Sequence, residues 1–119
     1  MPLYLTRATY SPETWAKLIA RPEDRRAAAR AEVESVGGKL HGVWYSLGSH
    51  DLYVLREVPD TVSMAAIAAR VASLGAVQNL ETIPLLSVEE MLDALATAAT
   101  ITYTPPGDDR VGPRSTDRR

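Results

Sequence analysis

The stretch from residue 39 to residue 58 constrains the fold most, because it contains two strand-like runs separated by a short bend. Residues 39–47 and 51–58 are rich in β-branched, aromatic and aliphatic side chains. Gly48-Ser49-His50 lies between them, with a length and composition typical of a hairpin connection. The chain is therefore predicted to contain a β-hairpin, and the sheet built on it to contain antiparallel strands.

Cap residues, prolines and hydrophobic spacing predict the remaining elements. Before the hairpin come a strand at residues 3–10, a helix that starts after Ser11 and breaks at Pro22, and a longer helix that ends at Gly37-Gly38. After the hairpin come a helix from 61 to 74 capped by Asp60, a strand at 76–85, and a last helix from a Ser87–Glu90 capping box to about residue 99. The order βαββαβ followed by one helix predicts an α+β, ferredoxin-like fold, with an antiparallel sheet and its helices on one face.

The longer of the two helices before the hairpin is predicted to be amphipathic. Ala27, Ala31 and residues 33–36 are expected to form its inward stripe. The charged side chains are expected on a solvated face: Arg25, Arg26, Arg30, Glu32 and Glu34.

The length of 119 residues predicts one folded domain and a tail. Residues 1–100 are expected to form the domain. Residues 101–119 are rich in proline, glycine and charge, so ordering them would cost more entropy than their few apolar groups could offset. They are expected to form a flexible C-terminal tail.

Composition excludes several classes of function. The chain contains no cysteine, so disulfides, thiolate nucleophiles and cysteine-based zinc sites are absent. The net charge of −2 offers no overall attraction for nucleic acid. No apolar run is long enough to span a bilayer, and no secretory leader is evident. We therefore expect a cytoplasmic protein that binds neither nucleic acid nor membrane, with no predicted cofactor or metal site.

The second strand of the hairpin predicts self-association. Leu52 and Val54 alternate with Tyr53 and Leu55, so both faces of this strand carry apolar side chains. The helices can cover only one face of the sheet, and large exposed apolar patches are uncommon on monomers. A homodimer, or a larger homo-oligomer, would cover the other face.

The bend itself offers one candidate catalytic residue, His50. A neighbouring carboxylate, Asp51, would favour the charged form of the imidazole and suit it to general acid or base chemistry. The alternative is structural: Gly48 permits the backbone of the bend, Asp51 accepts hydrogen bonds from nearby amides, and His50 decorates the surface.

The first strand of the hairpin could present either of two sets of side chains to a pocket. If its odd-numbered residues line the open sheet face, His41 and Tyr45 would meet Tyr53 there; if its even-numbered residues do, Trp44 and Ser46 would meet Tyr53. A bulge would exchange the two sets. The predicted ligand-binding residues for a small aromatic or apolar ligand are Trp44, Tyr45, His50, Asp51 and Tyr53.

Four segments together resemble the GYD-domain family of the dimeric α/β-barrel superfamily: "MPLYLTRATY", "GGKL", "WYSLGSHDLYVLREVPD" and "SLGAVQNLET". The resemblance covers roughly residues 1–95. Gly48 and Asp51 stand at the Gly and Asp positions of the family's Gly-Tyr-Asp triplet, with His50 where tyrosine is usual. The resemblance implies a dimer formed sheet to sheet, and pockets between sheet and helices or at subunit contacts. Because the family's members are mostly of unknown function, it implies no activity.

Three functions remain open at this point. The first is a homodimeric small-molecule-binding protein with its ligand beside the bend. The second is a cofactor-independent enzyme of the monooxygenase or isomerase kind, with a histidine as proton shuttle. The third is a plain oligomerisation module.

Overall fold

The computed structural model describes residues 1–107. The chain consists of two compact units, Met1–Leu86 and a segment that starts at Ser87. Most of the predicted tail lies outside the described residues, and residues 101–107 contain neither helix nor strand. The predicted boundary at residue 100 therefore stays a prediction.

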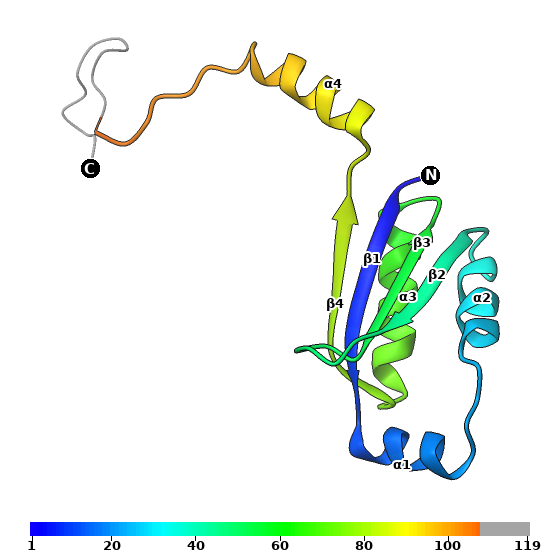
Figure 1. Cartoon of the computed structure of the whole chain (residues 1–119). Helices are drawn as coiled ribbons and strands as arrows, with labels where there is room; N and C mark the ends of the chain where they lie inside the picture. Colours follow the sequence, from blue (N-terminus) through cyan, green and yellow to red (C-terminus); the bar gives the residue numbers. More distant parts are fainter. Residues whose placement is uncertain (108–119) are drawn as a thin grey trace. The chain divides into compact units, whose positions relative to one another are not determined.

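The first unit is a four-stranded antiparallel sheet with helices on one face (Figure 1). Its strands run in the order β2-β3-β1-β4 across the sheet. The strands are β1 (Leu3–Tyr10), β2 (Lys39–Tyr45), β3 (Leu52–Glu57) and β4 (Val77–Leu85), and the helices are α1 (Pro12–Ala20), α2 (Arg26–Glu34) and α3 (Thr61–Ser73). The predicted α+β class and ferredoxin-like order are confirmed.

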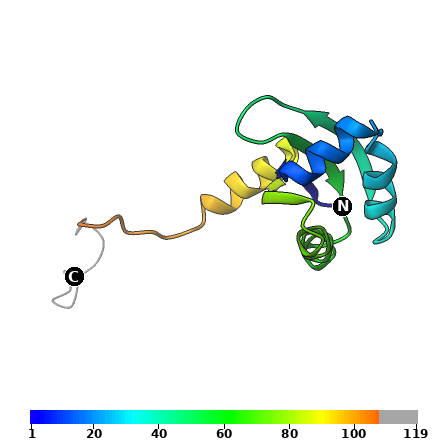
Figure 2. The same ribbon diagram turned by 90° about the horizontal axis from the view of Figure 1, so that it is seen from below.

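Helices α2 and α3 lie on the same side of the sheet, as the end-on view also shows (Figure 2). The predicted caps form: the Ser11 hydroxyl accepts the Thr14 N–H at 3.1 Å, and the Asp60 carboxylate accepts the Ser63 N–H at 2.8 Å. These side chains satisfy N–H groups that the first turn of a helix leaves without partners.

The hydrophobic core lies between the sheet and the helices. Alternate residues of β1 are buried, as expected for a strand that is covered on one face. The core cluster joins Tyr4, Val33, Val58, Met64 and Ile67. Within α2, Val33 is the buried residue, whereas Ala27 and Ala31 are exposed, so the predicted inward stripe was right only at its C-terminal end.

A β-bulge in β2 decides which side chains of this strand face the helices. Leu40 pairs with Arg56 but Gly42 pairs with Leu55, so His41 is the extra residue. The side-chain alternation therefore changes phase at His41. Neither predicted set, odd or even, lies on one face throughout, because the bulge falls inside the strand.

Beyond the bulge, neighbouring side chains of β2 separate to opposite faces. Val43 pairs with the buried Val54 on the helix-covered face, and Trp44 pairs with Tyr53 on the open face. Tyr45 returns to the helix side, where its hydroxyl lies 3.4 Å from that of Tyr10.

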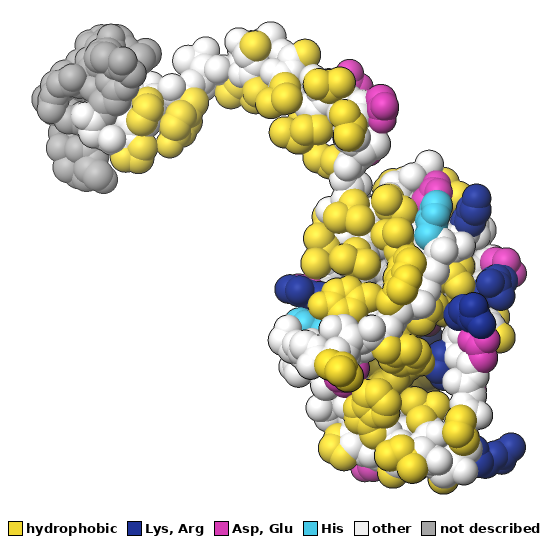
Figure 3. Space-filling view, viewed as in Figure 1, with side chains coloured by type: hydrophobic (Ala, Val, Ile, Leu, Met, Phe, Trp, Pro, Cys, Tyr) yellow, Lys and Arg dark blue, Asp and Glu magenta, His cyan; other side chains and the backbone are white. Residues whose placement is uncertain are grey.

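The open face of the sheet is largely apolar. Leu5 lies between Leu55 and Ile83 in the register, and Leu3 pairs with Leu85 at one end of the same face. Figure 3, viewed onto this side of the sheet, shows hydrophobic side chains gathered over the strands. The prediction that both sheet faces carry apolar residues is confirmed.

The second unit contains helix α4 (Val88–Ala98), which begins with the predicted Ser87–Glu90 capping box. No residue of this helix is buried. Its large apolar side chains follow the spacing of one helical face and are all exposed: Val88, Met91, Leu92 and Leu95.

Two glycines beside the hairpin differ in what they require. Gly38 packs tightly: a Cβ built there would lie 2.3 Å from the Glu57 carbonyl oxygen and 2.7 Å from Val33 Cγ2. Gly48 does not have a positive φ, and a Cβ there would meet only the Ser46 hydroxyl, at 3.4 Å. The expectation that the bend needs a glycine at position 48 was therefore wrong, because its backbone is one that other residues adopt.

We expect Gly38→Ala to lower the free energy of unfolding by about 1–3 kcal/mol, since the methyl group would overlap backbone that cannot move freely. The matched control, Gly48→Ala, should change it by less than about 0.5 kcal/mol. Urea unfolding monitored by tryptophan fluorescence measures both. Equal effects of the two substitutions would contradict this account of the close approach.

Candidate functional site

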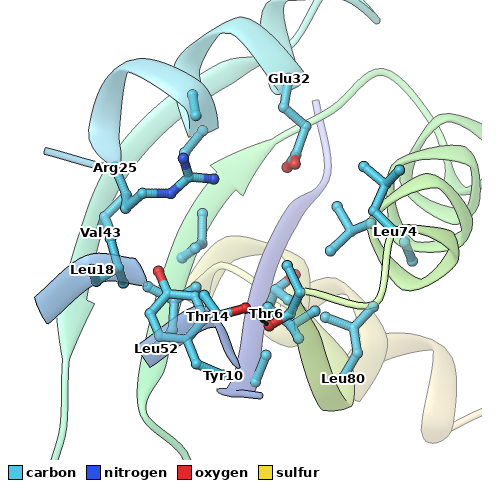
Figure 4. Close-up of a pocket in the computed structure, with 18 of the residues that line it drawn as sticks. Thr6, Tyr10, Thr14, Leu18, Arg25, Glu32, Val43, Leu52, Leu74 and Leu80 are labelled. Atoms are coloured by element: carbon cyan, nitrogen blue, oxygen red, sulfur yellow. Dashed lines mark hydrogen bonds between the residues drawn. The ribbon is translucent and has the colours of Figure 1, made fainter. Parts of the chain in front are cut away.

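A cavity of about 330 Å³ lies between the helix-covered face of the sheet and helices α1, α2 and α3 (Figure 4). Small side chains leave this space open. The central strand β1 contributes Thr6 and Ala8, and the helices contribute Ala28, Ala29 and Ala68. Because these residues cannot fill the gap between α2 and α3, the cavity has a volume in the range typical of ligand sites.

The floor of the cavity holds a buried arginine. The Arg56 side chain projects from β3 with its residue only 3% exposed. Its Nη1 donates to Glu32 Oε1 at 2.9 Å and its Nη2 donates to Thr6 Oγ1 at 3.1 Å, while Nε is buried with no partner in residues 1–107. Burial raises the pKa of Glu32 and lowers the pKa of Arg56, although their mutual attraction opposes both shifts.

Glu32 and Arg25 line the same cavity, contrary to the expectation that both belong to a solvated helix face. Together with Ala28 and Ala29, these residues are spaced as one face of a helix, and this spacing could have predicted that they lie on the same side. For Arg56, the signal was the alternation of side chains along the strand. Arg56 shares a face with Val54 and Leu52, and Leu55 lies on the opposite face.

A group of aromatic residues lies beside the cavity. Tyr10 lines it and is 4% exposed, and burial followed by the contact with Tyr45 raises the pKa of its phenol. The Tyr10 ring meets Trp15 edge to face at a centroid distance of 5.2 Å. Arg25 lies nearby, paired with Glu23.

Of the predicted ligand-binding residues, Tyr45 lies beside this site. With Arg25 and Val43 it lines a smaller adjoining cavity of about 250 Å³. Trp44 and Tyr53 lie opposite each other on the open sheet face, where Trp44 is 52% exposed.

Asp51 joins the bend to two other elements. Its Oδ2 accepts the Tyr10 backbone N–H at 3.0 Å and the Trp15 indole N–H at 3.3 Å. Its own backbone N–H donates to the Ala8 carbonyl at 2.9 Å. These contacts connect the hairpin bend to the end of β1 and to α1, and they agree with the structural alternative for this residue.

His50 lies next to Asp51 but lines neither of the two cavities. Its Nδ1 lies 3.2 Å from the Ser49 hydroxyl. The other histidine, His41, contacts Glu57 on the open face, and Arg7 pairs with Glu81 of the neighbouring strand on the same face.

In residues 1–107, no three or more histidine and acidic side chains are grouped so that they could hold a metal ion. Among the same residues, no helix has both the length and the apolar character needed to cross a membrane.

We expect Asp51→Ala to lower the free energy of unfolding by about 1–3 kcal/mol, because it leaves the N–H of the buried Tyr10 without an acceptor. Asp51→Asn keeps an acceptor oxygen and should cost less. His50→Ala serves as the neighbouring control and should be almost neutral. Thermal and urea unfolding of the three variants test this order, and a neutral Asp51→Ala would contradict the structural role.

No curated protein matches this sequence. A family model described as the GYD domain matches residues 4–95, a range that includes all strands of the sheet except the first residue of β1, every residue that lines the cavity, and the hairpin bend. Because this match covers most of the 119 residues, the chain belongs to the GYD domain family.

Proposed function

We propose that this protein is a homodimer that binds a small, largely apolar molecule in the cavity between the sheet and helices α1, α2 and α3. The observation that carries this proposal is the cavity itself, which is apolar over most of its lining and also contains a few polar and charged groups. This combination is typical of small-molecule sites.

The size of the cavity limits the ligand. A dry cavity of about 150 Å³ is large enough to bind benzene. At about 330 Å³, this cavity has room for a molecule with about two fused rings, or for a short alkyl chain with a polar head. Tyr45 and Arg25 lie where they would border such a ligand at the adjoining smaller cavity.

The open face of the sheet supports the homodimer. Leu5, Leu55 and Ile83 form a continuous apolar row across three strands, and Trp44 and Tyr53 extend the apolar surface onto β2. Covering such a face with a second copy would bury an area near the roughly 800 Å² per partner typical of specific interfaces. In this proposal Trp44 and Tyr53 serve the dimer, and Tyr45 serves the ligand.

A binding role fits the contacts better than catalysis. The Asp51 carboxylate is bonded to Tyr10 and Trp15, and His50 lines neither cavity. A catalytic role for His50 stays a prediction, and no contact in the described residues favours it.

Filling the cavity should abolish binding. We expect indole or 2-naphthol, at millimolar concentration, to raise the melting temperature of the wild type by several degrees. Ala29→Trp, which places an indole in the cavity, should remove that shift. Ala27→Trp is the matched control, because residue 27 lies on the exposed side of the same helix. A shift that persists in Ala29→Trp would place the binding elsewhere, and no shift in the wild type would contradict the proposal.

Charging the open face should dissociate the dimer. A dimer of two 12.9 kDa chains has a mass of 25.8 kDa (2 × 12.9). Light scattering at micromolar concentration should give this mass for the wild type and half of it for Leu55→Arg, because an arginine there would be buried unpaired against the second copy. Val62→Arg, on the exposed side of α3, is the control and should remain dimeric. A monomeric wild type would refute the dimer.

A further inference from the structure

The charged groups of the cavity do not balance. Its lining includes the cationic side chains of Lys17, Arg25 and Arg56 and the acidic side chains of Glu23 and Glu32. Three positive groups and two negative groups leave one positive charge. Arg25 pairs with Glu23 and Arg56 pairs with Glu32, and Lys17 has no ion-pair partner among residues 1–107.

Hydrogen-bond donors are also in excess. A guanidinium group carries more N–H donors than the two contacts of Arg56 use, and its buried Nε has no acceptor in the described chain. The Arg25 guanidinium contacts Glu23 through one nitrogen. Burial raises the pKa of the Glu32 carboxyl, and the positive charges of both arginines lie close enough to oppose this rise in part. The Arg56 guanidinium therefore keeps donor capacity that the oxygens of residues 1–107 do not use.

The charged groups are confined to one part of the lining: they come from α1, residues 23–32 and β3, whereas the lining residues of α3 and β4 carry no charge. Figure 4 shows Arg25 and Glu32 on the α2 side and Leu74 and Leu80 on the side of α3 and β4. Val71 and Val77 add to the apolar wall. A molecule that complements both walls must itself be polar at one end and apolar at the other.

We propose that the ligand is an apolar molecule with a single carboxylate, which binds beside Arg25 and Arg56 while its apolar body lies against Val71, Leu74 and Leu80. This inference rests on the proposed binding function. A carboxylate fits these residues, since it accepts several N–H bonds from a guanidinium, and its charge offsets the net positive charge of the cavity lining as a whole.

Glu32 has a defined part in this arrangement. Its carboxylate shares the Arg56 guanidinium and repels a second carboxylate that approaches the same arginine. Glu32→Gln keeps an oxygen acceptor for Arg56 and removes the repulsion. This variant should therefore bind an anionic ligand more tightly, and a neutral ligand with unchanged affinity.

The test compares 2-naphthoate with 2-naphthamide, which share one apolar body, by isothermal titration calorimetry on the full chain at pH 7. The wild type should bind the acid at least tenfold more tightly than the amide. Arg25→Gln should remove most of this preference, and Glu32→Gln should increase it several-fold. Arg30→Gln is the matched control: it removes the same charge from an exposed position of α2 outside the cavity, and it should keep the preference.

Each result of this test either supports or refutes the inferred carboxylate. If the acid and the amide bind equally, the carboxylate is refuted while the cavity remains a binding site. If neither binds, the proposed function fails as well. If Arg30→Gln reduces the preference as much as Arg25→Gln, the effect is general surface electrostatics and the inference falls. If Arg25→Gln or Glu32→Gln does not fold, the wild type decides alone, and a preference for the acid of less than tenfold then refutes the inference.

Discussion

The buried guanidinium of Arg56 is the constraint on which the helix-covered side of this domain depends. A charge buried on a central strand must be paired and hydrogen-bonded, because an unpaired one would cost several kcal/mol. Thr6 on the neighbouring strand and Glu32 on α2 supply those partners. The contact fixes one turn of α2 over β3 and, in the same step, places an acidic and a basic group in the wall of the cavity. The position of the helix and the polarity of the cavity therefore have one physical origin.

The hairpin bend has a different task from the one that its composition first suggested. Asp51 accepts hydrogen bonds from the backbone of Tyr10 and from the indole of Trp15, so it holds together the bend, the end of β1 and the start of α1. Tyr10 is itself part of the cavity wall and lies near Tyr45. Asp51 thus supports the site indirectly, through the residues whose orientation it fixes.

One strand serves both faces of the sheet because successive side chains point to opposite sides, and the bulge at His41 decides which face each of them takes. Trp44 and Tyr45 are adjacent, yet Trp44 belongs to the apolar open face and Tyr45 to the edge of the cavity. An association surface and a ligand site can therefore lie back to back, separated by the thickness of one sheet.

The sequence by itself determined the order of the elements, most of their ends and the apolar character of both sheet faces, because caps, prolines and alternation are local signals within a few residues. Only the tertiary structure decided the site. Arg25, Glu32 and Arg56 belong to two segments that are far apart in the chain, and their meeting over β1 depends on how α2 packs, which no local pattern encodes. The register of β2 was undecided for the same reason, since a single bulged residue reverses the faces without altering the strand's composition. Tertiary packing, through the close approach of Gly38 and the pairing of Arg56, selects among arrangements that the sequence leaves equally open.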